Sequence, residues 1–239
     1  MSILSDKIVV ITGGLGQVGW AASNRLAGLG ATVVAIVRRD LEDANKRMKW
    51  LNPRCYAILA DVTYSKSLEE AAKQIGRCDI LINAAGYTRS ITPVKLQELT
   101  DDIFDSIINT NLKGTFSAIR AFHPLMDQGI IVNISSTAGL RASTSNLAYG
   151  AAKAGIDLLT KSLAKSLAPK VRVVGIAPGY LINPTSCAVK PAGANEHIAN
   201  LTPLKRVGEA EDIADMIESV INNKHITGQT IVVDGGISL

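Results

Sequence analysis

One stretch near the N-terminus decides the fold: Lys7-Ile8-Val9-Val10-Ile11-Thr12, followed directly by Gly13-Gly14-Leu15-Gly16-Gln17-Val18-Gly19. The β-branched run is typical of a buried strand, and the Gly-rich turn leads into the helical pattern of Gly16–Leu29. Glycine allows the main chain to approach a pyrophosphate, and a helix N-terminus offers free N–H groups and a positive dipole end. This order predicts a nucleotide-binding unit; a purely structural turn is the alternative.

The same alternation of strand and helix continues along the chain. Further strands are predicted at Thr32–Val37, Cys55–Ala60, Asp79–Ile82, Ile130–Ile134, Val171–Ile176 and Thr230–Val233. Helices are predicted at Asp40–Trp50, Ser67–Ile75, Gln97–Phe122 and Ala148–Leu167. Alternating strands and helices imply βαβ units with right-handed crossovers. We therefore expect a single Rossmann domain over residues 1–239, an α/β fold with a doubly wound, seven-stranded parallel sheet and helices on both faces.

The composition agrees with that architecture and excludes several classes of protein. Of the 239 residues, 47% are hydrophobic but only 4% are aromatic, so the core must consist of Ala, Val, Ile and Leu, as buried parallel strands require. Disordered and disulfide-scaffold proteins are excluded. The net charge of +4 is spread out, without the clustered basic stripe of a nucleic-acid binder. No apolar run approaches the roughly 20 residues of a membrane span, which predicts a cytoplasmic protein.

Neither the cysteines nor the histidines indicate a metal site. The three cysteines are widely separated and form no CxxC motif, which is typical of cytosolic thiols. His123, His197 and His225 show no metal-ligand spacing. We therefore expect no metal cofactor.

The end of the second strand bears on the choice of cofactor. A dinucleotide fold normally places Asp or Glu there to hold the adenosine ribose 2′-hydroxyl, but this chain has Val37, followed by Arg38 and Arg39. Without the carboxylate, a 2′-phosphate is not repelled, and a guanidinium can bind it with two hydrogen bonds. This pattern favours NADP(H) over NAD(H); an exposed Arg pair is the alternative interpretation.

A Ser, a Tyr and a Lys converge in the predicted fold. Tyr149 and Lys153 lie one turn apart on one face of a helix, and Ser136 follows the strand Ile130–Ile134. Ligands of open α/β sheets bind at the carboxyl ends of strands, so the three side chains are expected beside the cofactor. A neighbouring cation lowers the pKa of a phenol and allows proton exchange near neutral pH. The pattern predicts proton transfer by Tyr149; a buried Tyr beside a solvated Lys is the alternative.

Several short motifs complete a pattern that covers the whole chain. They are Asp61-Val62, Asn83-Ala84-Ala85-Gly86, Asn111 in Asn-Leu-Lys-Gly, Pro178-Gly179, Gly228-Gln229 and Asp234-Gly235-Gly236. With the Gly-rich turn, Ser136, Tyr149 and Lys153, they make the chain resemble the single-domain branch of the short-chain dehydrogenase/reductase family. The resemblance implies an NAD(P)-dependent oxidoreductase that interconverts a carbonyl and a secondary alcohol.

The resemblance also implies roles for individual residues. Tyr149 would be the acid/base, Ser136 would position the carbonyl, Lys153 would hold the nicotinamide ribose and lower the Tyr pKa, and Asn111 would hold a proton-relaying water. For Asn111 a solvent-facing position is the alternative, and for Asp61 a helix N-cap. Cofactor contacts are implied for Gly13, Leu15, Gly16, Gln17, Val18, Gly19, Arg38, Arg39, Asp61, Val62, Asn83, Ala84, Gly86, Tyr149, Lys153, Pro178, Gly179, Leu181 and Asn183.

Three positions depart from the family pattern. Gln17 stands where the single-domain branch usually has Gly, Ala84 replaces the second Asn of Asn-Asn-Ala-Gly, and Asn183 replaces a Thr. These departures affect the expected cofactor contacts and leave the Ser, Tyr, Lys and Asn set unchanged.

The substrate is less determined than the reaction. Segments around Ala85–Ser90 and Ile108–Gly114 resemble 3-oxoacyl-carrier-protein reductases, which predicts an acyl thioester as a substrate. Those enzymes carry basic residues before the fifth and sixth strands, where this chain has Asp127-Gln128 and Pro169-Lys170, so an acyl carrier protein as partner stays open. A polar or sugar-type substrate with NAD(H), and a non-catalytic NADP(H)-binding regulator, are the alternatives.

A long irregular segment and two long helices complete the expectations. Residues Tyr180–Leu204 are expected to form a loop that covers the substrate. The resemblance also implies a homo-oligomer, a dimer or a tetramer, built on the helices Gln97–Phe122 and Ala148–Leu167. On the first of these, an apolar stripe runs from Phe104 to Ile119 at three- or four-residue spacing.

Overall fold

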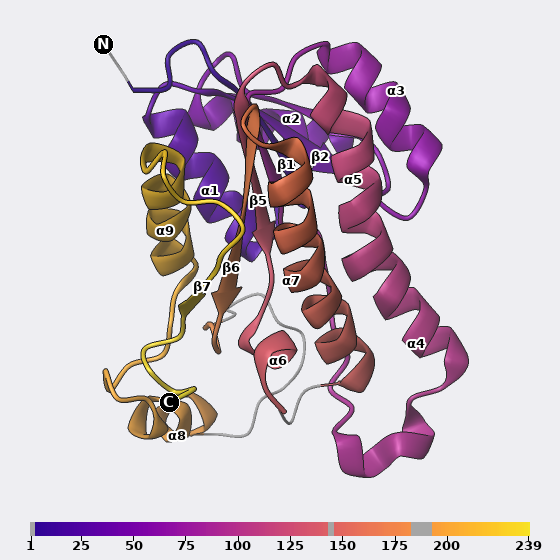
Figure 1. Cartoon of the computed structure of the whole chain (residues 1–239), viewed down its shortest axis with the longest axis vertical. Coiled ribbons are helices and arrows are strands. Elements are labelled where there is room, and N and C mark those ends of the chain that lie inside the picture. Colours follow the sequence, from indigo (N-terminus) through magenta and orange to yellow (C-terminus); the bar gives the residue numbers. More distant parts are fainter. Residues whose placement is uncertain (1–2, 143–145, 183–192) are drawn as a thin grey trace.

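The computed structural model describes residues 3–142, 146–182 and 193–239, and at its centre lies a seven-stranded parallel sheet (Figure 1). The strands are β1 Ile8–Thr12, β2 Thr32–Val37, β3 Tyr56–Leu59, β4 Ile80–Asn83, β5 Gly129–Ile134, β6 Val171–Pro178 and β7 Thr230–Val233. Their order, β3-β2-β1-β4-β5-β6-β7, is that of a doubly wound sheet and confirms the predicted fold class. The chain reverses its direction of winding between β1 and β4, and ligands of such sheets bind at that switch point.

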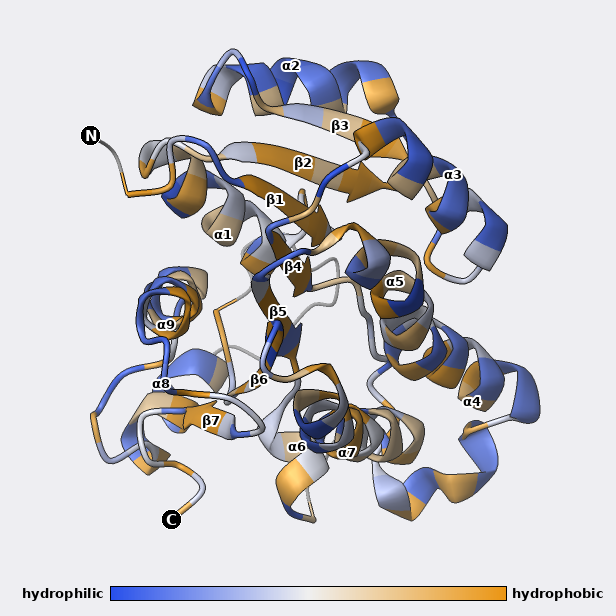
Figure 2. Cartoon of the chain, turned by 45° about the horizontal axis from the view of Figure 1, so that its top comes forward, coloured by the Kyte–Doolittle hydropathy of each residue, from blue (hydrophilic) through white to orange (hydrophobic). Residues whose placement is uncertain are grey.

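Helices cover both faces of the sheet. They are α1 Gln17–Gly28, α2 Leu41–Leu51, α3 Ser65–Ile75, α4 Asp101–Ile108, α5 Gly114–Phe122, α6 Thr137–Leu140, α7 Leu147–Leu167, α8 Ala194–Leu201 and α9 Ala210–Asn222. Helices α1, α2 and α9 pack on one face, and α3, α5 and α7 on the other (Figure 2). Within the described ranges, no helix is long and apolar enough to cross a membrane.

The alternation of side chains along each strand produces two apolar layers. On β1, Val9 and Ile11 contribute to the layer under α1, α2 and α9, whereas Val10 contributes to the layer under α3 and α5. Successive strand side chains point to opposite faces, so a strand covered on both sides must be apolar throughout. Figure 2 shows this as hydrophobic strands between helices whose outer surfaces are hydrophilic.

The predicted helix Gln97–Phe122 is four elements rather than one. Gln97 belongs to a 3-10 segment, Pro93–Glu98, and α4 begins at Asp101 because the side chain of Thr100 accepts a hydrogen bond from Ile103 N. A π-helical turn, Asn109–Lys113, then separates α4 from α5. A π turn inserts an extra residue and rotates the helix that follows, and such turns are frequent at functional sites.

The segment Tyr180–Leu204 is also more regular than the sequence indicates. Its last third is helix α8, and Leu181 forms an isolated parallel bridge with Gly208. Residues 183–192 lie outside the described part of the chain. Weak local helical signals in a Pro- and Asn-rich segment explain why the prediction missed α8.

The amino ends of β1 and β4 are joined by a buried carboxylate. Asp79 accepts hydrogen bonds from Ile8 N at 2.9 Å, from Lys7 Nζ at 3.2 Å and from Arg77 Nη2 at 2.9 Å. Burial raises the pKa of Asp79, but these three donors more than offset it and hold the pKa below its usual value. The folded state therefore favours the ionised carboxylate.

We expect Asp79→Asn to lower the free energy of unfolding by about 1–3 kcal/mol at neutral pH, because an amide cannot satisfy all three donors. The folded-state pKa lies below the unfolded value of about 3.9, so this contribution is full at neutral pH and is lost as pH falls below about 4. Urea unfolding of both proteins at several pH values measures it. A difference that did not shrink in acid would contradict this account.

Candidate active site

Two glycines of the first turn are required by close contacts. Gly13 has φ of +65°, and a Cβ there would lie 2.9 Å from the Cα of Ala85. A Cβ on Gly19 would lie 2.1 Å from the carbonyl oxygen of Gly13. No side chain fits at either position, so the turn packs directly against helix α1 and against the segment that follows β4.

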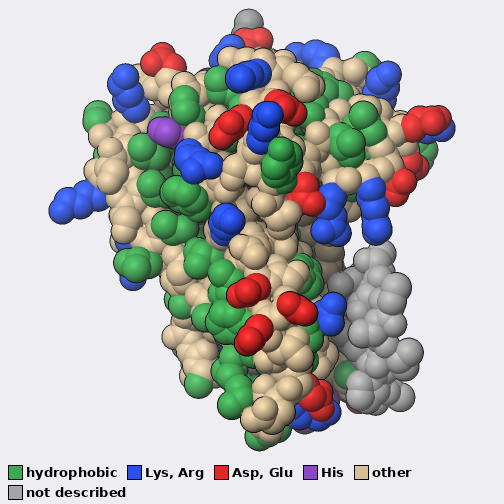
Figure 3. Space-filling view, turned by 90° about the vertical axis from the view of Figure 1, so that its right-hand side faces the viewer, with side chains coloured by type: hydrophobic (Ala, Val, Ile, Leu, Met, Phe, Trp, Pro, Cys, Tyr) green, Lys and Arg blue, Asp and Glu red, His purple; other side chains and the backbone are tan. Residues whose placement is uncertain are grey.

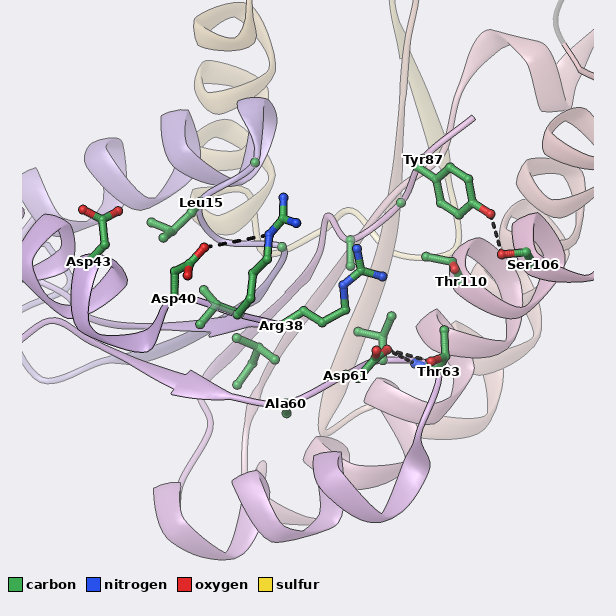
Figure 4. A pocket seen from close by; sticks show the side chains of 18 of the residues that line it. Leu15, Arg38, Asp40, Asp43, Ala60, Asp61, Thr63, Tyr87, Ser106 and Thr110 are labelled. Carbon is green, nitrogen blue, oxygen red and sulfur yellow. Dashed lines mark hydrogen bonds and ion pairs between the residues drawn. The ribbon is translucent and has the colours of Figure 1, made fainter. Parts of the chain in front are cut away.

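A cavity of about 860 Å³ opens beside this turn, at the carboxyl ends of β1, β2, β3 and β4. Its walls come from five segments that are separate in the chain, and Figure 4 shows most of their side chains. The lining residues are Gly13, Leu15, Gly16, Ile36, Val37, Arg38, Arg39, Asp40, Asp43, Arg47, Ala60, Asp61, Val62, Thr63, Ala85, Gly86, Tyr87, Arg89, Ser106 and Thr110.

The cavity therefore contains many of the predicted cofactor residues. Three of them belong to the Gly-rich turn: Gly13, Leu15 and Gly16. The others that line the cavity are Arg38, Arg39, Asp61, Val62 and Gly86. Helix α1 begins beside the cavity without a side-chain cap and without an acidic residue in its first turn. The N–H groups of that turn are thus left for an anionic group, as in a dinucleotide site.

Charged groups of both signs line the end of the cavity beyond β2. In Figure 4, Arg38 lies between Asp40 and Asp61. Arg39 is largely exposed, and its Nε lies 3.9 Å from Oδ2 of Asp40. Arg47 is held by stacking on α1, with its guanidinium 4.6 Å from the centroid of the Trp20 ring. Three guanidinium groups and two carboxylates, those of Arg38, Arg39, Arg47, Asp40 and Asp43, thus line this end of the cavity.

Asp61 and Val62 form the wall that follows β3. Oδ1 of Asp61 accepts from Thr63 N at 2.8 Å and from Thr63 Oγ1 at 2.7 Å, which orients the carboxylate at the cavity edge. Helix α3 begins at Ser65, so Asp61 is not its N-cap. Val62 packs on Gly114, where a Cβ would lie 2.9 Å from Val62 Cγ2. This contact explains the Gly of the Asn-Leu-Lys-Gly motif.

Ser136, Tyr149 and Lys153 meet at the carboxyl end of β5. Oγ of Ser136 caps α6 by accepting from Ala138 N at 3.2 Å, and Ser136 hydrogen-bonds the Tyr149 side chain. The cap of α7 is Asn146, whose Oδ1 accepts from Tyr149 N at 3.4 Å. Nζ of Lys153 donates to Ile134 O at 2.7 Å and lies 5.4 Å from the centroid of the Tyr149 ring.

Burial shifts the pKa of both ionisable side chains of this group, Tyr149 and Lys153. It raises the pKa of Tyr149, an effect that the hydrogen bond from Ser136 opposes. It lowers the pKa of Lys153 to about 8, against the effect of the negative charge of Asp157. At neutral pH the phenol is therefore protonated and the ammonium is largely charged, which is the state in which a phenol donates a proton.

Asn111 lies in the π-helical turn and faces the same group. Its Nδ2 donates to Tyr87 O and to Ile107 O, both at 2.9 Å. Oδ1 is buried and has no hydrogen-bond partner among the described residues. A Cβ on Gly86 would lie 2.5 Å from this oxygen and 3.7 Å from Nζ of Lys153, so Gly86 leaves the space between them open. An acceptor in that position is suited to a water or a ligand hydroxyl.

A nicotinamide dinucleotide fits these residues. The uncapped N-terminus of α1, the Gly13 turn and the cavity would take its adenosine and phosphate groups. The orphaned Asn111 Oδ1 and the Lys153 ammonium would offer an acceptor and a donor to a ribose hydroxyl. When bound, such a group supplies or accepts a hydride; the protein supplies the phenol, the hydroxyl and the cation.

Other predicted residues take positions outside the large cavity. The Asn83 side chain is buried in the sheet, where it donates to Asn133 Oδ1 at 2.9 Å. Gly179 packs on Asp234, and a Cβ there would lie 2.6 Å from Asp234 Cβ. Leu181 lines a smaller neighbouring cavity of about 100 Å³. Gln17, Val18, Gly19, Ala84 and Pro178 flank the site without lining the large cavity, and Asn183 lies outside the described residues.

Two hydrogen bonds of the site are not predicted from the sequence. Nε2 of Gln17 donates to Ile182 O, so the residue that departs from the family pattern ties α1 to the segment after β6. Tyr87 OH donates to Ser106 Oγ at 2.6 Å, and both residues line the cavity (Figure 4). No local signal identifies these pairs, because their members are far apart in the chain.

Comparison with known proteins defines first the class and then the family. The family model described as enoyl-(acyl carrier protein) reductase matches residues 16–238. The chain is 33% identical to the 3-oxoacyl-(acyl-carrier-protein) reductase of Thermotoga maritima, over 98% of each chain, and 32% identical to mouse 3-hydroxyacyl-CoA dehydrogenase type-2, over 97% of this chain and 95% of the other. It is thus an NAD(P)-dependent oxidoreductase acting on CH–OH groups.

Solved structures agree with this class. A 3-oxoacyl-(acyl-carrier protein) reductase from Brucella melitensis superimposes with a TM-score of 0.91 at 32% identity, covering 98% of this chain and 92% of the other. A Brucella melitensis protein described as a glucose/ribitol dehydrogenase gives 0.92 at 28% identity, covering 99% and 98%. The chain belongs to the short-chain dehydrogenase/reductase family.

Proposed function

We propose that the protein is an NADP(H)-dependent reductase of 3-oxoacyl thioesters, with Tyr149 as the acid/base. The observation that carries the proposal is the Ser136–Tyr149–Lys153 group beside a cavity whose far end holds Arg38. The names of the 3-oxoacyl reductases and hydroxyacyl dehydrogenases among the relatives support the thioester.

The chain's own residues account for the proton side of the reaction. Ser136 donates a hydrogen bond to the substrate carbonyl oxygen, which orients it and stabilises the negative charge that develops there. Tyr149 then gives its phenolic proton to that oxygen as the carbonyl carbon receives a hydride, and the product is a secondary alcohol. Lys153 stabilises the phenolate that remains, and Asn111 Oδ1 holds a water through which the proton is replaced.

The proposal is tested by measuring NADPH oxidation with a panel of carbonyl compounds. We expect turnover with 3-oxoacyl thioesters, in the range of typical enzymes at about 1–10³ s⁻¹, and slower reaction with simple ketones. Ribitol and glucose with NAD⁺ are the matched comparison, since the glucose/ribitol dehydrogenase neighbour supports a polar alcohol as the second candidate. Faster reaction with that pair would overturn the thioester assignment, and absence of turnover on the whole panel would support a regulator.

We also propose a homo-oligomer that forms through α4, α5 and α7. Phe104 and Phe116 are 40% and 42% exposed, and Leu158 on α7 is 65% exposed. Figure 3 views the side that carries α3, α4 and α5 and shows hydrophobic side chains among acidic and basic groups. Burial of such side chains between two subunits supplies the main driving force for association.

We expect sedimentation of the wild type as a dimer or tetramer. Phe116→Glu together with Leu158→Glu should reduce the sedimenting mass to that of a smaller species, because buried carboxylates without partners oppose association. Trp50→Glu is the matched control, since Trp50 is exposed on α2, on the other side of the sheet. A monomeric wild type would contradict the proposal.

A further inference from the structure

Helix α7 buries a second charged residue, Asp157, that the proposed reaction does not use. It follows Lys153 by one helical turn, so both side chains lie on the same face of α7. Asp157 is 6% exposed and Lys153 is 5% exposed. An ionised carboxylate is costly to bury unless other groups stabilise it. A buried carboxylate outside the proposed reaction therefore indicates a specific role.

The carboxylate is held by hydroxyl groups rather than by a direct ion pair. Its Oδ1 accepts from Thr230 Oγ1 on β7 at 2.9 Å, whereas its Oδ2 is buried without a hydrogen-bond partner among the described residues. Burial raises the pKa of Asp157, and the hydroxyls of Ser135, at the end of β5, and of Thr230 act in the opposite direction. Gly175 on β6 makes room for this arrangement, because a Cβ there would lie 2.5 Å from Thr230 Oγ1. Three strands thus shape a pocket for one carboxylate.

The charged groups around this carboxylate are few. Among the described residues, those that influence its titration are Lys153 and Lys161, one turn to either side on α7. The neighbouring elements bring neutral groups: Ser135 from β5, Thr230 from β7 and, on the side of Lys153, the Asn111 amide. Among the described residues, Asp157 is the acidic group whose charge acts on the Lys153 ammonium.

Lys153 needs such a charge. Its Nζ is buried and hydrogen-bonds Ile134 O, a neutral acceptor. Burial alone lowers the pKa of Lys153 towards neutrality, and Asp157 acts in the opposite direction. A deprotonated Lys153 would carry no charge to stabilise a Tyr149 phenolate and would have one donor fewer for a ribose hydroxyl.

We propose that Asp157 is a positioning residue that keeps Lys153 protonated in neutral solution and so sets the alkaline limit of the reaction. Its effect on turnover rests on the proposed function, whereas its effect on Lys153 does not. The hydrogen bond from Thr230 and the space left by Gly175 hold the carboxylate in place.

The direct test is the titration of Lys153 in the protein without cofactor. The protein is labelled with 13Cε-lysine, and the Lys153 signal is assigned by its loss in Lys153→Met. In Asp157→Asn, which preserves shape, we expect the Lys153 pKa to fall by about 0.5–1 unit, since a nearby opposite charge favours the charged form. In Thr230→Val, which keeps the carboxylate but removes its hydroxyl donor, we expect a smaller change.

A reciprocal measurement covers the case in which Asp157→Asn does not fold. Coupling between two charges is mutual, so Lys153→Met should raise the pKa of Asp157, read from 13Cγ-labelled aspartate. An unchanged Asp157 titration in that variant, or an unchanged Lys153 titration in folded Asp157→Asn, would overturn the proposal.

Kinetics then separate this role from a structural one. In Asp157→Asn the alkaline limb of kcat should move to lower pH by the same amount as the Lys153 pKa, whereas Thr230→Val should lose stability with little movement of that limb. If both variants lost stability equally and neither moved the limb, Asp157 would only tie α7 to β7. Failure of the substrate panel would leave the NMR result standing, so the two proposals fail independently.

Discussion

Replacing Tyr149 with Phe is expected to lower kcat by about 10²–10⁴-fold while the Kd for NADPH stays within about twofold. The substitution removes the one hydroxyl that Ser136 hydrogen-bonds and that lies on the ring beside Lys153. The ring itself is retained, so the packing of α7 against its neighbours should not change. Single-turnover kinetics and fluorescence titration with NADPH measure the two quantities separately.

Tyr56→Phe is the matched control for that variant. Tyr56 is a half-buried Tyr on β3, and burial raises its pKa as it does that of Tyr149, but it has no partner in the Ser–Tyr–Lys group. It should keep wild-type kcat. Wild-type turnover in Tyr149→Phe on a proven substrate would show that the acid/base lies elsewhere.

Arg38→Ala is expected to raise the KM for NADPH by about 10–100-fold, since a hydrogen bond to a charged group contributes about 1.5–3 kcal/mol. The KM for NADH should change little, because the lost contact is to the 2′-phosphate. Arg38 lines the cavity directly after β2, where Val37 replaces the acidic residue of NAD-binding folds. Steady-state kinetics with both cofactors give the ratio.

Arg39→Ala makes that experiment more specific. The Arg39 side chain is 84% exposed and faces Asp40, so its removal should weaken NADPH binding less than removal of Arg38. A wild-type enzyme that reacted faster with NADH, or an Arg38→Ala variant that lost both cofactors equally, would speak against the 2′-phosphate contact.

The predicted sheet was confirmed strand by strand, because its signals are local. Buried parallel strands appear as short β-branched runs, and Thr32–Val37 and Thr230–Val233 have the predicted bounds. The helix after the Gly-rich turn and helix α7 begin within one residue of the predicted positions. Glycine and an Asn cap mark these starts directly in the sequence.

The errors occur where a local signal is overridden by packing. The periodic apolar stripe of Gln97–Phe122 predicts one helix, but the buried positions in the structure include Ile107, Asn111 and Thr115, and a π turn shifts the face between them. Phe104 and Phe116 of the stripe are substantially exposed instead. Periodicity reports an apolar face but does not say whether the core or another subunit covers it.

In the candidate site, too, local relations were predicted from the sequence and long-range contacts were not. Spacing within one element predicts that Tyr149 and Lys153 share a helix face, and motif order predicts where Ser136 and Asn111 fall. Pairs that bridge distant segments gave no signal: Tyr87 with Ser106 and Trp20 with Arg47 meet only after folding.

From the sequence alone follow the doubly wound fold, the Gly-rich turn at its first crossover and the identity of the Ser–Tyr–Lys group, because each depends on residues that are neighbours in the chain. Only the tertiary structure decided that Gln17 reaches Ile182, that Gly86 leaves space beside Asn111, and that Thr230 holds Asp157 near Lys153. Parallel pairing brings segments more than 70 residues apart to one edge of the sheet. Such contacts leave no periodicity or fixed spacing in the sequence, so they cannot be predicted from it.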